Sequence, residues 1–473
     1  MMKTKLLLFW ISISLIGLAK AQQADGEKPN FIFIFSDDQR YDLIGALGHP
    51  EVLTPNLDRL VHEGAVFTHA YNMGAWNGAV CVASRAMMIS GLSVWDARDQ
   101  ESEFQQMADE GRFWPQLLEK AGYETYMTGK WHVKADAGSI FQNVVHVRPG
   151  MPNQTPEGYD RPKSEADTTW QPWDKSFEGF WKGGKHWSEV LADDARGFLQ
   201  QAGKSAAPFL MYLAFNAPHD PRQAPKEFVD MYPVESIALP ASHMDMYPYK
   251  DSIGLSENLR DEALAPFPRN AYSVRKNIQE YYAIISHMDA QIGKILDALE
   301  ATGKRDNTYI LFTADHGLAV GHHGLMGKQN MFDHSIRAPL LLVGPRIPEG
   351  KRYQQQVYLQ DVSATIMDLA GVEKPETTVF NSLMPYVETG APSAYPAIYS
   401  CYLDLQRMVR TERYKLIFYP KLNKILLFDL EKDTGELRDR SADPDYQGIK
   451  QHLLLLLADQ QRSVNDPLGP IER

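Results

Sequence analysis

The most reactive side chain in this sequence, Cys81, lies in the stretch Cys81-Val82-Ala83-Ser84-Arg85. The residues from Ser84 to Ile89 predict the opening of a helix, and Gly91 suits its C-terminal end. Free backbone N–H groups and the macrodipole at a helix N-terminus favour an anion. Cys81, at or just before this N-terminus, is therefore placed to act as a nucleophile beside a negatively charged substrate. A structural small residue leading into a helix is the alternative reading of Cys81 alone.

Four further groups of polar side chains each follow an apolar segment that predicts a strand. The segments are 30–36, 123–128, 208–215 and 308–313, and the groups after them are Asp37-Asp38, Lys130 with His132, His219, and Asp315-His316. The carboxyl ends of parallel strands collect at one edge of an open sheet, where ligands bind. Each group alone could be a solvated turn, but the four together predict one site.

The charges of this predicted site divide into two sets. Asp37, Asp38 and Asp315 supply three carboxylates, which would repel one another without a divalent cation. Oxygen ligands in a flexible geometry favour Ca²⁺, with Mg²⁺ as second choice. Positive charge and hydrogen-bond donors come from Arg85, Lys130, His132, His219 and Lys328. An anion held between the metal and these cations has all its oxygens satisfied. The site therefore suits a tetrahedral oxyanion ester, either a sulfate or a phosphate.

The elements that must position these side chains alternate between strands and helices over about 350 residues, which predicts an α/β sandwich with a largely parallel sheet. Helices are expected after Pro55 and over 114–120, 187–201 and 274–301. The pattern changes near residue 385. Strands at 397–402, 406–411, 414–419 and 425–430 and a helix over 447–457 predict a small antiparallel sheet with one helix. The domain boundaries expected are a catalytic domain over 22–385 and a C-terminal subdomain over 386–473.

Two segments without clear periodicity, 135–186 and 222–272, are rich in Pro or Gly and are expected to form loops over the site. The first of them and its C-terminal border contain four tryptophans, Trp170, Trp173, Trp181 and Trp187. Indole rings can stack on sugar faces, which would suit a carbohydrate substrate. They can equally form small satellite cores under long loops, and the sequence leaves both readings open.

The first 21 residues predict a secretory signal peptide. Lys3 and Lys5 precede an apolar run from Leu6 to Leu18, and Ala19-Lys20-Ala21 suits signal cleavage. We expect a periplasmic or secreted protein with no membrane anchor, since no cysteine follows the cleavage site and no later stretch is long enough to span a bilayer. The formal net charge of −12 argues against nucleic acid as a partner.

The two cysteines, Cys81 and Cys401, admit two interpretations in an exported protein. They could form a disulfide in an oxidising compartment. If Cys81 is instead chemically converted, Cys401 is a lone and buried thiol. A disulfide at Cys81 would exclude a catalytic role for this residue.

The ordered set of motifs resembles the sulfatase family of the type matured to formylglycine. The motifs are Asp37-Asp38, Cys81-x-Ala-Ser-Arg85, Gly129-Lys130-x-His132, Pro218-His219 and Asp315-His316-Gly317 with Lys328. The resemblance runs from residue 30 to about 345. It implies an alkaline-phosphatase-like three-layer sandwich, hydrolysis of a sulfate ester, and oxidation of Cys81 to formylglycine (3-oxoalanine) by a formylglycine-generating maturation enzyme. The Asp-His-Gly form is shared by some carbohydrate-acting members.

The resemblance also implies a role for each motif residue. The metal ligands would be Asp37, Asp38, oxidised Cys81, Asp315 and His316. Arg85 and Lys130 would hold the formylglycine and the sulfate, and one hydroxyl of the formylglycine hydrate would be the nucleophile. His132 would take a proton from the remaining hydroxyl, so that the covalent sulfate is expelled and the aldehyde restored. Lys328 or His219 would protonate the leaving alcohol.

The function expected is therefore a secreted sulfatase acting on a sulfated polysaccharide, or its oligosaccharides, of the algal-glycan or glycosaminoglycan type. Lys130, His219 and Lys328 are expected to contact the substrate, and His323 is a further candidate contact. A phosphodiesterase or phosphonate monoester hydrolase on the same scaffold is the alternative enzyme. A non-catalytic carbohydrate-binding protein is the alternative outside catalysis.

Overall fold

The strand at the centre of the molecule, β1 (Asn30–Ser36), is buried along its whole length. The computed structural model describes residues 27–153 and 155–471, so the predicted signal peptide lies outside the described residues. β1 pairs in parallel with β8 (Phe209–Ala214) on one side and β9 (Thr308–Ala314) on the other. Its apolar residues serve both faces of the sheet, as a continuous apolar run predicts.

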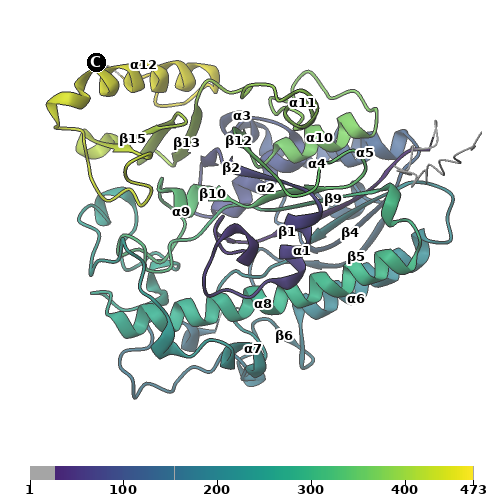
Figure 1. Ribbon diagram of the computed structural model, residues 1–473, viewed down its shortest axis with the longest axis horizontal. Helices are drawn as coiled ribbons and strands as arrows, with labels where there is room; N and C mark the ends of the chain where they lie inside the picture. Colours follow the sequence, from purple (N-terminus) through teal and green to yellow (C-terminus); the bar gives the residue numbers. More distant parts are fainter. Residues whose placement is uncertain (1–26, 154, 472–473) are drawn as a thin grey trace, which may run out of the picture.

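The large sheet is mostly parallel, as expected (Figure 1). Its strand order is β10 (Arg337–Ala338), β2 (Ala65–Tyr71), β11 (Leu340–Val343), β9, β1, β8, β4 (Glu124–Lys130) and β5 (Asn143–Arg148), with β12 (Lys351–Tyr358) also paired to β2. The run from β9 to β5 is parallel throughout, whereas β11 is antiparallel to its neighbours β9 and β2.

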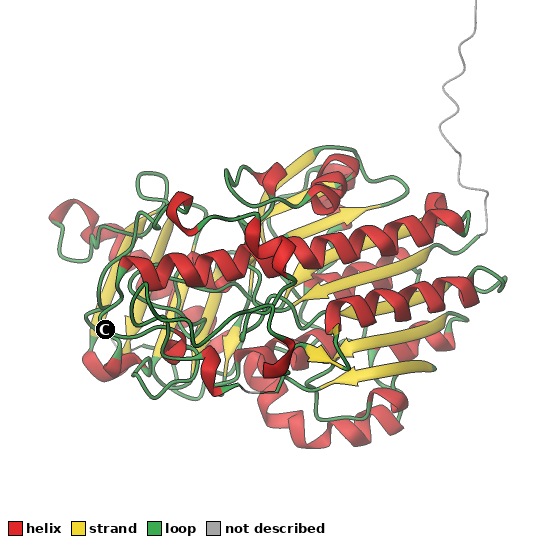
Figure 2. Ribbon diagram, turned by 90° about the horizontal axis from the view of Figure 1, so that it is seen from below, coloured by secondary structure: helices red, strands yellow, loops and turns green. Residues whose placement is uncertain are grey.

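Helices cover both faces of this sheet and make the molecule a three-layer sandwich. Ile32 and Ile34 of β1 share one core with α1 (Pro55–Glu63), α6 (Trp187–Ala202) and α8 (Ala271–Ala301). Phe31, Phe33 and Phe35 face the other core, with α2 (Val80–Ser90), α5 (Trp114–Lys120) and α10 (Asp361–Leu369). Figure 2 shows α6 and α8 lying along the strands. The alternation of side chains along a strand explains why one segment supplies both cores.

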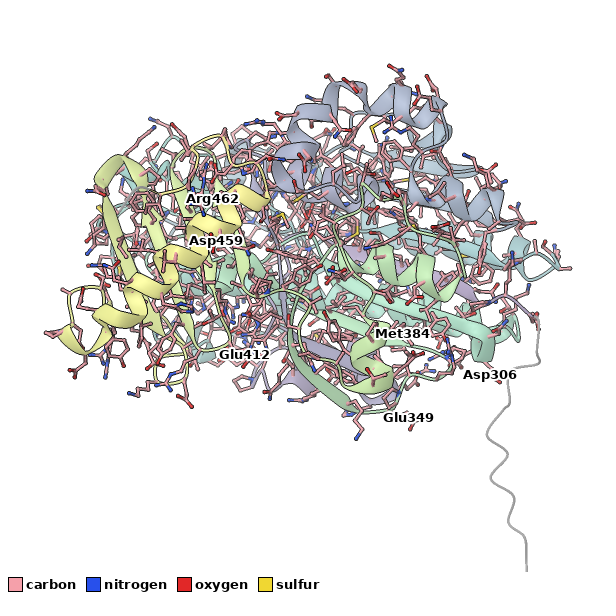
Figure 3. The ribbon with its side chains drawn as sticks, turned by 90° about the horizontal axis from the view of Figure 1, so that it is seen from above. Asp306, Glu349, Met384, Glu412, Asp459 and Arg462 are labelled. Carbon is pink, nitrogen blue, oxygen red and sulfur yellow. The ribbon has the colours of Figure 1, made fainter. Side chains whose placement is uncertain are left out.

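A second, smaller sheet lies beside the sandwich. Its order is β16 (Lys424–Asp429), β15 (Tyr414–Tyr419), β14 (Gln406–Arg410), β13 (Ile398–Tyr402) and β3 (Gly74–Ala75). The four C-terminal strands are antiparallel, as predicted, and α12 (Gln447–Ser463) packs on them. The outer face of α12 carries an ion pair of 2.6 Å between Arg462 and Asp459, which Figure 3 labels.

The short strand β3 joins the two sheets, and the sequence did not reveal it. Gly74 has a φ of +104° and lies against Cys401 in β13, with which β3 pairs in parallel. A Cβ at Gly74 would come within 2.1 Å of the carbonyl oxygen of Cys401. Only glycine permits this close approach, so the N-terminal part of the chain supplies the edge strand of the small sheet.

Several elements lie where the sequence predicted loops. The segment 135–186 contains β5, which forms the edge of the large sheet, and the hairpin of β6 (Trp181–Lys182) and β7 (Lys185–His186).

The remaining helices are α3 (Val94–Gln100), α4 (Phe104–Asp109), α7 (Lys226–Asp230), α9 (Asp333–Ile336) and α11 (Met384–Thr389). The predicted domain boundary at residue 385 falls inside α11. Within the described ranges, no helix combines the length and hydropathy needed to cross a bilayer.

The tryptophans of the predicted loops form small cores. Trp170, Trp181 and Trp187 are each less than 7% exposed. The ring of Trp170 stacks on Phe177 at 5.1 Å, and the guanidinium of Arg148 lies over Trp187 at 4.6 Å. These rings are covered by protein, so the satellite-core reading holds for them. Trp173 is half-buried under the ammonium group of Lys226, 5.1 Å from the ring centre.

Candidate active site

The carboxyl ends of β1, β4, β8 and β9 lie at one edge of the large sheet and bring their polar side chains together. The N–H of Asp37 donates to the carbonyl of Ala217 at 3.1 Å, and the N–H of Asp315 donates to that of Ser36 at 3.2 Å. Asp38 has a φ of +67°, and its N–H donates to a carboxylate oxygen of Asp315 at 3.1 Å. These contacts turn the chain sharply after each strand and point the acids into one space.

Cys81 lies in the first turn of α2, which begins at Val80 and so starts before the predicted Ser84. Its side chain is buried, with the ammonium group of Lys328 3.4 Å from the sulfur. Burial raises the pKa of the thiol, but the charges of Lys130 and Lys328 outweigh it and hold that pKa well below its usual value. Cys81 and Cys401 are both free thiols, so the disulfide reading does not hold.

His132 stands beside Cys81 and is half-buried. A hydrogen bond to Cys81 raises its pKa, but the larger effect is burial, and the net pKa lies below its ordinary value. An imidazole that is mostly neutral can accept a proton from a neighbouring group.

Four groups form a compact set of possible metal ligands. The ligand atoms of Asp37, Asp38, Cys81 and His316 all lie within 4.8 Å of one another. The Nδ1 of His316 is 2.8 Å from the carbonyl of Gly317, which makes Nδ1–H the donor, so that in the neutral imidazole the lone pair is on Nε2. Nε2 lies 3.1 Å from a carboxylate oxygen of Asp38 and 3.5 Å from one of Asp315.

Two buried atoms in this set indicate that a cation fits between them. Among residues 27–153 and 155–471, neither Oδ1 of Asp37 nor Nε2 of His316 has a hydrogen-bond partner. Burial and the negative charge of Asp315 raise the pKa of Asp37 well above its usual range, although Lys130 opposes them. The carboxylate of Asp37 therefore lacks sufficient positive charge, and a divalent cation at this point would supply it.

Three buried cations border the acids. Lys130 pairs with Asp37, and Gly129 before it has a φ of +98°, where a Cβ would come within 1.9 Å of the carbonyl oxygen of Ala214. Arg85 donates to Asp315 at 3.1 Å and to the carbonyl of Lys130 at 3.0 Å. Lys328 donates to both oxygens of Asp38 at 2.8 Å. Together they make a pocket floor that favours an anion.

His219 approaches the same space from the loop after β8. Its Nδ1–H donates to the carbonyl of Asp220 at 2.7 Å, which leaves Nε2 facing the site. Nε2 is 3.8 Å from a carboxylate oxygen of Asp38, the residue that also pairs with Lys328. The two predicted proton donors thus lie on the same side of the acids.

The structure places one predicted contact residue in a different environment. His323 is 4% exposed, and its ring stacks on Phe332 at 3.9 Å. Its two ring nitrogens lie 3.2 Å from Nε2 of His334 and 3.1 Å from the carbonyl oxygen of Glu436. A ring with both nitrogens and one face engaged by protein has no edge left for a sugar. The prediction rested on the position of His323 near the site residues in the sequence, and the structure instead packs its ring against Phe332.

Sequence reasoning missed the residues that hold the site from behind. The carbonyl of Asp315 accepts hydrogen bonds from Asn72 at 2.5 Å and from the hydroxyl of Ser84 at 2.8 Å. Arg260 lies 3.4 Å from Nε2 of His219. Asn72 lies close after β2, so the strand-end argument could have found it, whereas Arg260 lies in the segment 222–272, where no periodicity marks a strand end.

Two known families match this chain. The sulfatase family matches residues 29–372, which is most of the chain. A second family, described as N-sulphoglucosamine sulphohydrolase, C-terminal, matches residues 321–463 and so covers the four C-terminal strands of the small sheet.

Three similar proteins illustrate the range of these relatives. The N-acetylglucosamine-6-O-sulfatase of Bacteroides thetaiotaomicron is 25% identical over 98% of this chain and 91% of its own. A solved structure in complex with its substrate, D-glucosamine-2-N,6-O-disulfate, superposes with a TM-score of 0.74 at 22% identity, covering 94% of this chain and 100% of that one. The phosphonate monoester hydrolase of Silicibacter pomeroyi shares the fold, with a TM-score of 0.71 at 19% identity over 92% and 96% of the two chains.

Proposed function

Since this chain belongs to the sulfatase family, we propose that it hydrolyses sulfate esters of a sulfated polysaccharide or of oligosaccharides made from one. The observation that carries the proposal is Cys81 at the start of α2, buried between Lys328 and the ligand set of Asp37, Asp38 and His316. A nucleophile, a cation site and an anion pocket in one place are the parts that hydrolysis of such an ester requires.

The carbohydrate substrate is supported by relatives of both kinds. The C-terminal family is named for a sulfatase of N-sulphoglucosamine, and the relative from Bacteroides thetaiotaomicron acts on N-acetylglucosamine 6-sulfate groups by its name. The substrate in the solved complex is a glucosamine disulfate. We propose a glycan of the glycosaminoglycan or algal type as the substrate of this chain.

In the proposed reaction, Cys81 is first oxidised to formylglycine by the maturation enzyme, and the hydrate of formylglycine supplies the attacking hydroxyl. The bound cation, Ca²⁺ or as second choice Mg²⁺, would be held by Asp37, Asp38, Asp315, His316 and the oxidised side chain at position 81. When bound, it supplies Lewis-acid polarisation of the sulfate oxygens.

The remaining residues bind the sulfate or move protons. Arg85 and Lys130 orient the side chain at position 81 and the sulfate through charge-assisted hydrogen bonds. His132 accepts the proton that must leave the side chain at position 81 when the sulfate is expelled. His219 or Lys328 delivers a proton to the oxygen of the leaving alcohol. We further propose export to the periplasm or the medium, on the basis of the predicted signal peptide.

The test is release of inorganic sulfate by protein produced together with a formylglycine-generating enzyme. A panel of glycosaminoglycan and algal glycan oligosaccharides should contain at least one substrate, and Cys81→Ala should release none from it. Absence of sulfate release from every sulfated glycan would overturn the proposal.

The phosphonate or phosphodiester reading keeps support from the shared fold of the phosphonate monoester hydrolase. Rates measured side by side on an aryl sulfate and an aryl phosphonate distinguish the two readings. We expect the sulfate to be preferred, because the sulfatase family matches this chain over residues 29–372.

A further inference from the structure

The two predicted proton donors, His219 and Lys328, come from loops that lie far apart in the chain. One short segment, Arg260-Asp261-Glu262, contacts both loops. It belongs to the Pro-rich stretch between α7 and α8, which the sequence placed in no particular role. The side chains of Asp261 and Glu262 are at most 2% exposed, so this segment is part of the interior.

On the His219 side, the contact runs through a buried carboxylate. Asp220 is 1% exposed, and its Oδ1 lies 3.2 Å from Nδ1 of His219. The other carboxylate oxygen of Asp220, Oδ2, accepts a hydrogen bond from the hydroxyl of Tyr159 at 2.8 Å. Nε of Arg260 lies 3.6 Å from this same Oδ2. A second nitrogen of Arg260 is 3.4 Å from Nε2 of His219. Arg260 and Asp220 therefore hold the imidazole from its two ends. Because a guanidinium only donates, Arg260 must move away from Nε2 before that atom can carry a proton to the leaving alcohol.

On the Lys328 side, the segment Arg260-Asp261-Glu262 forms hydrogen bonds with the residues just before and just after Lys328. Glu262 accepts the backbone N–H groups of Met326 at 3.1 Å and Gly327 at 2.9 Å. Asp261 accepts a hydrogen bond from the side chain of Gln329 at 2.8 Å and lies 3.9 Å from the ammonium group of Lys328. A Cβ at position 327 would come within 2.9 Å of the Cβ of Asp261, so the two segments are in close contact.

Arg260 joins the two sides. Its guanidinium donates to Asp261 at 2.5 Å and faces Asp220. This one group therefore bridges the carboxylate next to Lys328 and the carboxylate next to His219. The side chain of Arg260 is 30% exposed, whereas those of Asp220 and Asp261 are 1% and 2% exposed. A planar guanidinium suits this bridge better than an ammonium group, because its donors point in two directions at fixed angles.

We propose that Asp220, Arg260, Asp261 and Glu262 form a positioning clamp that sets His219 and Lys328 against the oxygen of the leaving alcohol. This inference rests on the proposed function. A proton donor works only within hydrogen-bond reach of its acceptor, and a displacement of about 1 Å can cost about 100-fold in rate. The four residues of the clamp act through the two donors and are not themselves the source of the proton.

The clamp has a signature that a purely structural role lacks. A phenol with an electron-withdrawing nitro group leaves readily as its anion and needs little help from a proton. A poorer leaving group depends on the donor. Loss of the clamp should therefore harm esters of poor leaving groups more than esters of good ones.

The experiment compares kcat/KM on 4-nitrophenyl sulfate and on phenyl sulfate, using the full chain with formylglycine at position 81 confirmed by mass. For Arg260→Gln we expect a loss of about 100-fold on phenyl sulfate and a loss at least about 5-fold smaller on 4-nitrophenyl sulfate. Asp261→Asn should show the same direction of preference. Arg260→Lys should restore part of the loss on phenyl sulfate, because it keeps the charge but not the fork.

The matched control is Arg413→Gln. Arg413 also bridges two carboxylates, Asp429 at 2.9 Å and Glu431 at 2.8 Å, and its side chain is 41% exposed, but it lies in the turn between β14 and β15. It should change neither rate by more than about 2-fold. Equal losses on both esters in Arg260→Gln and Asp261→Asn, in proteins that melt within a few degrees of the parent, would overturn the clamp. A correctly matured parent protein that releases sulfate from neither these esters nor any sulfated glycan would overturn the proposed function, and the clamp with it.

Discussion

Oδ1 of Asp37 and Nε2 of His316 are buried polar atoms that face the same small space. In the described part of the chain neither has a hydrogen-bond partner, and a buried atom of this kind costs about 1–3 kcal/mol when unsatisfied. Nδ1 of His316 is occupied by the carbonyl of Gly317, so Nε2 is the atom available for a metal. An imidazole is a less usual ligand for a hard cation, but its tautomer here suits that role.

Metal removal is therefore expected to affect both activity and stability. Dialysis against a chelator should abolish sulfate release and lower the melting temperature, because Oδ1 of Asp37 and Nε2 of His316 then lose the cation that satisfies them. Ca²⁺ at about 100 times its dissociation constant should restore about 2.7 kcal/mol of stability. Mg²⁺ added in place of Ca²⁺ serves as the comparison. A chelated, metal-free protein with full activity and an unchanged melting curve would contradict the assignment.

At the residue scale, sequence reasoning succeeded where the position after a strand carries the information. Asp37, Lys130, His219 and Asp315 all lie at the predicted edge, because parallel strands must end together. It did not find Arg260, whose position depends on how a Pro-rich segment folds back between two loops. Such a path is decided by tertiary contacts and leaves no periodic signal.

At the scale of elements, α10 begins at a buried acid, Asp361, which should make the free energy of unfolding depend on pH. Asp361 accepts hydrogen bonds from the backbone N–H groups of Tyr358 at 3.1 Å and Asn381 at 3.0 Å and from the hydroxyl of Tyr395 at 2.5 Å. Burial nevertheless raises the pKa of this carboxyl from 3.8 to about 7. The folded protein thus holds this proton more tightly than the unfolded chain between these two values.

Stability should therefore fall as the pH rises from about 4 to about 7, by at most about 1.4 kcal/mol per pH unit from this group. The measurement is urea unfolding of the parent and of Asp361→Asn at pH 5 and pH 7. The variant should show a smaller decrease between the two, even though its amide lowers stability at both. Asp368→Asn, at an exposed position of the same helix, should keep the parent's slope. Identical slopes in the parent and Asp361→Asn would refute this prediction.

Elements with strong patterns were predictable, and those that depend on their neighbours were not. The long helix α8 and the buried strand β1 follow from their apolar spacing. The edge strand β5 has the sequence Asn-Val-Val-His-Val-Arg, is half-exposed, and lies in a segment dominated by Pro and Gly. Its three valines favour a strand, and pairing with β4 fixes it at the edge of the sheet.

At the scale of the whole molecule, a buried ion cluster joins the small sheet to the sandwich. Lys415 of β15 is fully buried and contacts Glu436 at 2.6 Å, the carbonyl of Met331 at 3.2 Å, and Asp333 of α9. Glu436 in turn accepts the backbone N–H of Asp333 at 2.7 Å. Residues 331–333 lie in the connection between β9 and β10 that also carries Lys328. The small sheet therefore contacts and supports one side of the active site.

Lys415→Met should destabilise the protein by about 3 kcal/mol, because it leaves the buried carboxylate of Glu436 without its cation, whereas Asp333 keeps Arg337 and Arg410. Chemical unfolding of the variant and the parent measures this loss. Lys421→Met provides the control, since Lys421 forms a surface pair with Asp404 and both side chains are more than half exposed. That change should stay within about 0.5 kcal/mol. A Lys415→Met protein as stable as the parent would show that the cluster does not hold the two parts together.

The overall architecture was largely readable from the sequence, but the way the two sheets join was not. The alternation of strands and helices predicts the sandwich, and the closely spaced C-terminal strands predict the small sheet. The link through β3 consists of only two residues, Gly74 and Ala75. A strand of that length has no sequence signature and exists because Gly74 lets the backbone approach Cys401.

The central claim is that the thiol of Cys81 is a precursor and that its oxidised form does the chemistry. The most direct test is the mass of the tryptic peptide from Leu60 to Arg85, taken from protein produced with a formylglycine-generating enzyme. Conversion of the thiol to an aldehyde should lower this mass by about 18 Da and allow labelling by a hydrazide. A peptide that keeps the full thiol mass, or one linked to the peptide of Cys401, would contradict the account.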